Sequence, residues 1–176
     1  MEKFRSYIGQ LRLYSLADLV LLLVALHADT RQFIGVIILH LAFLAYLESK
    51  HSHSYRASVP QWISYILASI GIVMYGKIEG LIYLFFGLLY TQKISKLGLI
   101  SPVCRGLQSL FITAGIIGYY SPITYIIGIL LFLRNLAGDF RDTEKDRVGG
   151  MKTIPIVIGM NKNIKYIHLV FTILTS

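Results

Sequence analysis

The residues best suited to chemistry lie in one stretch, residues 135–159, which reads NLAGDFRDTEKDRVGGMKTIPIVIG. Asp139, Asp142, Glu144 and Asp146 place four acids within eight residues. On a helix, the three aspartates at i, i+3 and i+7 share one face, where like charges repel unless a cation lies among them. Hard carboxylate oxygens at this spacing suit Mg²⁺, which completes its shell with water or phosphate oxygens. Basic residues interleave with or flank the acids: Arg134, Arg141, Lys145, Arg147 and Lys152.

A second interpretation of this stretch is a solvated helix end with balanced charge. An EF-hand is excluded, because the order of acidic residues and glycine in its calcium loop is absent. Gly149 and Gly150 end the predicted helix, and Thr153-Ile154-Pro155 starts the chain in a new direction. The acidic cluster directly follows an apolar run of membrane length, where ionisable residues are costly and usually functional.

The composition indicates an integral membrane protein that is all-α. Of the 176 residues, 55% are hydrophobic and only 15% are charged, which is more apolar surface than a soluble domain can cover. A soluble helical bundle is disfavoured because the apolar segments lack a polar face. Cys104 is the only cysteine, so no intrachain disulfide forms. The MEKFR start resembles a signal-peptide n-region, but no good cleavage site follows, which predicts a retained membrane anchor.

The apolar segments predict a polytopic transmembrane helical bundle of about seven spans, forming a single domain over residues 1–176. Several segments are shorter than the roughly 20 residues of an upright span, and flanking Tyr, Trp, Ser and Gly are expected to complete them. The segments are Leu13–Ala28, Phe33–Leu47, Trp62–Tyr75, Gly80–Tyr90, Leu107–Tyr120, Ile123–Ala137 and Ile164–Leu174.

The basic residues predict the orientation of this bundle. The net charge of +8 follows the loops between apolar segments, so we expect no nucleic-acid partner. Fifteen of the 17 Lys and Arg residues fall on one side of the seven segments, and only Arg31 and Lys77 fall on the other. The positive-inside rule then predicts a multi-pass protein of the cell membrane whose amino terminus and Asp-rich loop are cytoplasmic.

Two further loops are predicted on the cytoplasmic face. Tyr90, Lys93 and Lys96 offer a phenol and two ammonium groups that suit an oxyanion such as diphosphate, although interfacial anchoring explains them equally well. The loop from Glu48 to Arg56 carries His51 and His53. A transition-metal site there is less favoured than a polar loop at the headgroup level.

The combination of these loops suits a ligand with a diphosphate head and a long hydrocarbon tail. Acid-bound Mg²⁺ and nearby cations stabilise the charge that builds on a departing diphosphate. An apolar bundle shields an allylic carbocation from water until an acceptor attacks.

The residues that carry this chemistry resemble the UbiA superfamily of intramembrane prenyltransferases. The resemblance rests on Asp139-x-x-Asp142-x-x-x-Asp146, followed by Gly150, Thr153-Ile-Pro155 and Gly159, which is similar to the second Asp-rich motif of that family. A weaker likeness covers most of the chain. It includes Leu11-Arg12, His53-Ser-Tyr-Arg56, and Tyr90 with Lys93 or Lys96, although neither lysine stands four residues after the tyrosine.

The resemblance implies transfer of a prenyl group from its diphosphate to an acceptor with Mg²⁺. The acceptor is a quinone precursor or a glycerol-phosphate lipid, both of which the superfamily uses. Asp139, Asp142 and Asp146 are the implied metal-binding and catalytic residues. The candidates for substrate binding are Tyr90, Lys93, Lys96, Arg141, Arg56 and Asn135.

Two departures from the family pattern keep a non-catalytic interpretation open. The first Asp-rich motif keeps Glu48 as its only acid. One of the two metal sites that the resemblance implies is therefore either missing or rebuilt, with Glu48 as the candidate metal ligand alone or with His51 and His53. The family usually has nine spans, which leaves three interpretations open: a fragment of a longer chain, a short relative, or an assembly with a second copy or a partner subunit. A non-catalytic isoprenoid-binding or partner-subunit protein is therefore the alternative function.

Two other membrane classes fit the residues less well. A CDP-alcohol phosphatidyltransferase needs a glycine directly after its second aspartate and a further acidic pair, whereas Asp142 is followed by Thr143. A transporter is disfavoured because the apolar segments hold few ionisable residues beyond Asp18.

Overall fold

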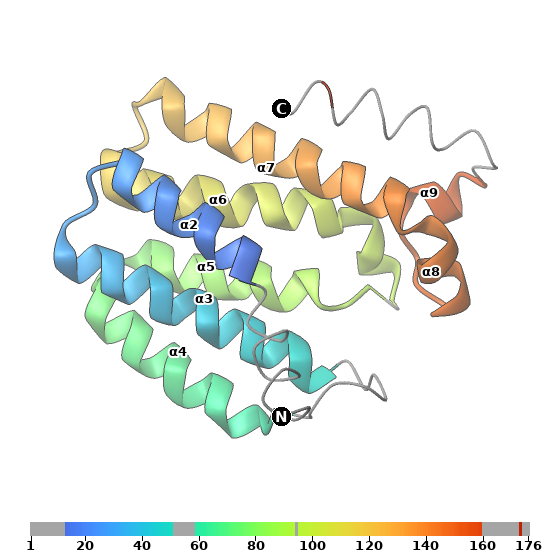
Figure 1. Cartoon of the computed structure of the whole chain (residues 1–176), viewed down its shortest axis with the longest axis horizontal. Helices are drawn as coiled ribbons and strands as arrows, with labels where there is room; N and C mark the ends of the chain where they lie inside the picture. Colours follow the sequence, from blue (N-terminus) through green and yellow to red (C-terminus); the bar gives the residue numbers. More distant parts are fainter. Residues whose placement is uncertain (1–12, 51–58, 94, 160–172, 174–176) are drawn as a thin grey trace. The chain divides into compact units, whose positions relative to one another are not determined.

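The computed structural model describes residues 13–50, 59–93, 95–159 and 173, and every regular element among these residues is helical. The all-α prediction is therefore confirmed for the described part of the chain (Figure 1). The elements are α2 (Leu13–Ala25), α3 (Thr30–Lys50), α4 (Gln61–Tyr75), α5 (Ile78–Tyr90), η1 (Lys96–Ile100), α6 (Ser101–Ile117), α7 (Pro122–Arg141), α8 (Thr143–Val148) and α9 (Ile154–Val157).

Three helical segments in the described ranges are long and apolar enough to cross a membrane: Thr30–Lys50, Lys96–Ile117 and Pro122–Arg141. The apolar helices α2, α4 and α5 are shorter. A 15-residue helix such as α4 is only about 22 Å long, which is less than the roughly 30 Å of a bilayer core. The prediction of about seven spans is therefore not supported, because apolar composition alone does not supply the length. Six predicted segments fall on helices, and the seventh, Ile164–Leu174, lies outside the described residues except for Ile173.

The chain forms two compact units, and the prediction of a single domain stays a prediction. The first unit comprises residues 1–84 with Gly115–Ile117, and within it α3 and α4 lie side by side and antiparallel (Figure 1). A Cβ added to Gly71 of α4 would lie 2.9 Å from the Leu39 side chain of α3, so this glycine allows the close approach. Arg31 Nε donates to the Met74 carbonyl at 2.9 Å and thereby satisfies the carboxyl end of α4.

The second unit comprises residues 85–114 and 118–176 and carries the acidic stretch. Within it α6 packs closely on α7, because a Cβ on Gly106 would lie 2.8 Å from the Gly128 carbonyl oxygen. The ring of Phe86, near the end of α5, stacks on Phe111 of α6 with centroids 5.8 Å apart. These contacts bring the end of α5, α6 and α7 together, and α8 and α9 follow α7 directly.

Candidate functional site

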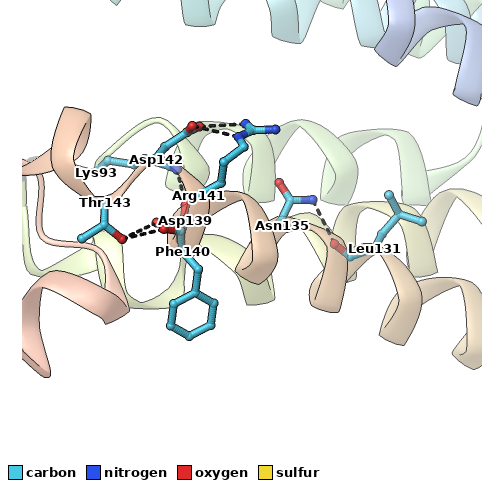
Figure 2. A network of polar contacts seen from close by, with 8 residues as sticks. All are labelled: Lys93, Leu131, Asn135, Asp139, Phe140, Arg141, Asp142 and Thr143. Atoms are coloured by element: carbon cyan, nitrogen blue, oxygen red, sulfur yellow. Dashed lines mark hydrogen bonds and ion pairs between the residues drawn. The ribbon is translucent and has the colours of Figure 1, made fainter. Parts of the chain in front are cut away.

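The acidic stretch forms a jointed helix rather than one continuous rod. Asp139 lies in the last turn of α7, Asp142 is the residue between α7 and α8, and Asp146 lies in α8. The Asp142 amide donates to the Gly138 carbonyl at 2.9 Å, and the Asp146 amide donates to the Asp142 carbonyl at 2.8 Å. The buried Thr143 hydroxyl donates to the Asp139 and Phe140 carbonyls, which satisfies backbone groups at the joint (Figure 2).

The three aspartates differ in their burial. Asp139 is 4% exposed and Asp146 is 6% exposed, so both carboxylates lie inside the unit. Asp142 is partly exposed, and both of its carboxylate oxygens accept hydrogen bonds from the Arg141 guanidinium, at 2.9 and 2.8 Å (Figure 2). The structure therefore places two of the predicted ligands in the interior and pairs the third with a cation at the surface.

Lys93 supplies the cation that the acidic cluster needs. Its Nζ lies 2.8 Å from Asp139 Oδ1, and the two side chains are only 16% and 5% exposed (Figure 2). The predicted alternative, Lys96, is exposed at the start of η1. Of the two lysines, Lys93 is thus the one that the structure pairs with an aspartate in the described residues.

The backbone around Lys93 is held in place by the glycine-rich turn that follows α8. The Lys152 amide donates to the Lys93 carbonyl at 2.9 Å. Gly98 packs against both segments, because an added Cβ would lie 2.6 Å from the Lys93 and the Lys152 carbonyl oxygens. The Met151 amide also donates to the Asp146 carbonyl at 2.9 Å. The turn therefore ties the loop that carries Lys93 to the helix that carries Asp146.

A second cationic group, Arg105, lies near the ring of the predicted tyrosine. Lys93 Nζ is 5.0 Å and Arg105 Cζ is 5.6 Å from the centroid of the Tyr90 ring. Arg105 Nη1 donates to Oε1 of the fully buried Gln108 at 2.7 Å. From the sequence, Arg105 served only to orient the bundle. Its i, i+3 spacing to a glutamine, on a helix with no other charged residue, was the signal that could have identified it.

The charges at the site shift the pKa values of its members. Burial lowers the pKa of Lys93, but Tyr90, Asp139 and Asp146 together outweigh burial and leave that pKa raised. The hydrogen bonds from Arg141, with the Arg141, Lys145 and Lys93 charges, lower the pKa of Asp142. Burial raises the pKa of Asp146, and the charges of Asp139 and Asp142 add to that rise against the opposing charge of Lys93. The Lys93 ammonium therefore acts electrostatically on Asp142 and Asp146 as well as on Asp139.

Two carboxylate oxygens at the site are buried without a hydrogen-bond partner: Asp139 Oδ2 and Asp146 Oδ2. A buried charged oxygen without a partner is costly, and a hard divalent cation is the ligand that such oxygens suit. The donor set therefore fits Mg²⁺ chemically. In the arrangement seen here, the described residues contain no group of three or more His, Cys, Asp or Glu side chains placed to hold a metal ion.

Among the remaining predicted site residues, Asn135 forms a hydrogen bond within its own helix. Asn135 Nδ2 donates to the Leu131 carbonyl at 2.9 Å within α7 (Figure 2). Glu48 is buried near the end of α3, in the first compact unit. Arg56, with His51 and His53, lies outside the described residues.

No family model, no curated protein and no solved structure matches this chain. The resemblance of the aspartate motif to the UbiA superfamily therefore stays a prediction. The geometry and the charges of the site are the grounds on which a function can be proposed.

Proposed function

We propose that this chain is a membrane protein of the intramembrane prenyltransferase type, which binds the diphosphate head of a prenyl diphosphate together with Mg²⁺. The observation that carries the proposal is the pair of buried carboxylates, Asp139 and Asp146, each with an unpartnered oxygen, beside a buried ammonium. They lie where a helix of membrane length ends. The end of such a helix lies near the boundary between the bilayer core and water, where the hydrocarbon tail and the polar head of a prenyl diphosphate meet.

In this proposal the acidic residues bind the metal ion and the basic residues bind the diphosphate. Asp139 and Asp146, with Asp142, hold the metal ion, which when bound neutralises charge on the diphosphate oxygens. Lys93 and Arg105, both near the Tyr90 ring, offer ammonium and guanidinium donors to phosphate oxygens. A tail of isoprene units lies along the apolar helices.

The proposed reaction breaks the bond between C1 of the prenyl chain and the diphosphate oxygen, and the electron pair leaves with the diphosphate. A new bond forms between C1 and a carbon of an aromatic quinone precursor or an oxygen of a glycerol-phosphate lipid. The acceptor loses one proton. The cations near Tyr90 stabilise the charge that develops on the departing diphosphate. The cell membrane, with the Asp-rich loop on the cytoplasmic side, is the proposed location.

A binding experiment tests the metal-dependent head-group site. The chain, purified in detergent, is titrated with geranylgeranyl diphosphate in Mg²⁺ and in EDTA. We expect Asp146→Asn to weaken the Mg²⁺-dependent binding by about tenfold or more, since removing groups that only support a metal ligand already costs that much. Glu144→Gln is the matched control, because Glu144 lies in the same helix but is 82% exposed and pairs with Arg147. Binding that ignores both EDTA and Asp146→Asn refutes the metal site.

Turnover distinguishes the enzyme from the alternative, a non-catalytic isoprenoid-binding protein. The family brings two acidic clusters to one diphosphate, whereas this sequence keeps one, and losing one stabilising group commonly costs about a hundredfold in rate. We therefore expect the chain alone to bind the diphosphate and to transfer its prenyl group slowly or not at all. Rapid multiple turnover with labelled substrate and an acceptor panel, lost in Asp142→Asn, contradicts that expectation.

A further inference from the structure

Lys93 occupies an unusual position for a residue that binds phosphate. Its ammonium is not directed to solvent but lies 2.8 Å from Asp139 Oδ1 in a largely buried ion pair. Its charge also acts on Asp142 and Asp146. One monovalent cation thus serves as a shared counter-ion of the three carboxylates that are proposed to hold a metal.

This pairing leaves two carboxylate oxygens of the cluster without a hydrogen-bond partner. Arg141 is bound to Asp142, and Lys93 hydrogen-bonds one oxygen of Asp139. The other oxygen of Asp139 and one oxygen of Asp146 stay buried and without a partner. Lys145 adds its charge near Asp142 and Asp146, but each of the two interior aspartates still has a buried oxygen without a hydrogen-bond partner.

The backbone of Lys93 is fixed, whereas its side chain reaches the aspartate through a chain of four methylene groups. The carbonyl of Lys93 is bound to the Lys152 amide, and Gly98 packs against both. Rotation about side-chain bonds is therefore sufficient to move the ammonium from Asp139 to a neighbouring anion. No rearrangement of the helices is required.

We propose that Lys93 is a specificity-determining residue. Its ammonium occupies the position of a divalent cation beside Asp139 and is displaced from that carboxylate when metal and diphosphate bind together. A metal ion and an ammonium on one carboxylate repel each other, so the metal alone must compete with Lys93. A diphosphate removes this competition, because its oxygens accept hydrogen bonds from the displaced ammonium. Metal and diphosphate then bind cooperatively, and neither binds well alone. This inference rests on the proposed function and adds the reason for selectivity toward the metal–diphosphate complex.

The test measures binding of Mn²⁺ alone, by electron paramagnetic resonance, and of inorganic diphosphate in excess Mn²⁺, using the full chain in detergent. Lys93→Met removes the charge, and Lys93→Gln removes it while keeping a hydrogen-bond donor for Asp139. We expect either variant to bind Mn²⁺ alone about tenfold more tightly than the wild type and diphosphate about tenfold more weakly, within the usual range of coupling between two ligands. Lys96→Met, in the same loop but exposed, is the matched control and is expected to leave both affinities within about twofold.

The outcomes separate the two proposals. Unchanged or weaker Mn²⁺ binding in the folded Lys93 variants, with Asp146-dependent binding of metal and diphosphate intact, overturns the role of Lys93 and leaves the proposed function standing. Absence of any Asp146-dependent binding of metal with diphosphate in the wild type overturns both. The glutamine variant decides the result if the methionine variant does not fold.

Discussion

The substitution Gly98→Ala tests whether the packing of two loops positions the site. Gly98 lies between the Lys93 carbonyl and the Lys152 carbonyl, and an added Cβ would meet each oxygen at 2.6 Å. Ordinary contact begins near 3.4 Å, so each backbone segment must withdraw by about 0.8 Å. The 2.9 Å hydrogen bond from the Lys152 amide to Lys93 joins the segments that must move.

Overpacking of this kind typically costs about 1–3 kcal/mol. For a chain of this size each kcal/mol lowers the melting temperature by about 2–4 °C, so we expect a fall of about 2–12 °C for Gly98→Ala. Metal-dependent binding of diphosphate is expected to weaken as well, because Lys93 moves with its backbone. Thermal unfolding in detergent, followed by circular dichroism, and the diphosphate titration measure the two effects.

Gly138→Ala is the matched control for this prediction. Gly138 lies in α7 next to Asp139, yet an added Cβ there meets nothing within 4 Å. Replacing a helical glycine in open space with alanine stabilises a helix by about 0.5–1 kcal/mol. A Gly98→Ala protein that melts and binds like the wild type refutes the argument that the Lys93 loop is tightly packed against the Lys152 turn.

Two further predictions concern ionisation and orientation. Burial raises the pKa of Asp146, so we expect acidification to weaken Mn²⁺ binding at a pH above the ordinary pKa of an aspartate. Electron paramagnetic resonance measured over a range of pH tests this, and a loss of Mn²⁺ binding only at or below the ordinary aspartate pKa contradicts it. The same raised pKa means that protonated Asp146 adds to the free energy of unfolding. This contribution is complete below the ordinary aspartate pKa and is lost as pH rises through the raised pKa of Asp146 in the folded protein. For orientation, Val148→Cys in a Cys104→Ser background places a thiol on a residue that is 91% exposed, and we expect membrane-impermeant reagents to label it only from the cytoplasmic side. Tyr120→Cys, between α6 and α7, is the opposite-side control, and reversed labelling of the two positions refutes the predicted topology.

Local composition was enough to predict the helices and the position of the acidic cluster. Runs of apolar residues predicted six segments that the structure describes as helices. The spacing of Asp139, Asp142 and Asp146 identified a candidate site without any knowledge of the tertiary structure. The predicted number of spans is not supported, because apolar character extends over helices such as α2 and α5 that are shorter than a bilayer core.

Only the tertiary structure decided how the aspartates differ. Periodicity placed all three on one face, but burial against neighbouring helices encloses Asp139 and Asp146 and leaves Asp142 partly exposed beside Arg141. The ion pair of Lys93 with Asp139 joins residues that are 46 positions apart. Neither the choice of Lys93 over Lys96 nor the position of Arg105 beside Tyr90 is encoded in a local pattern.

The sequence by itself determined which segments are helical and where the carboxylates are concentrated, because helix periodicity and apolar character are properties of neighbouring residues. The partner of each charge was decided by the fold, because an ion pair between distant residues forms only when the loops that carry them are packed together. Gly98 illustrates the difference: in the sequence it is an ordinary loop glycine, and in the structure it is the contact that sets the position of Lys93.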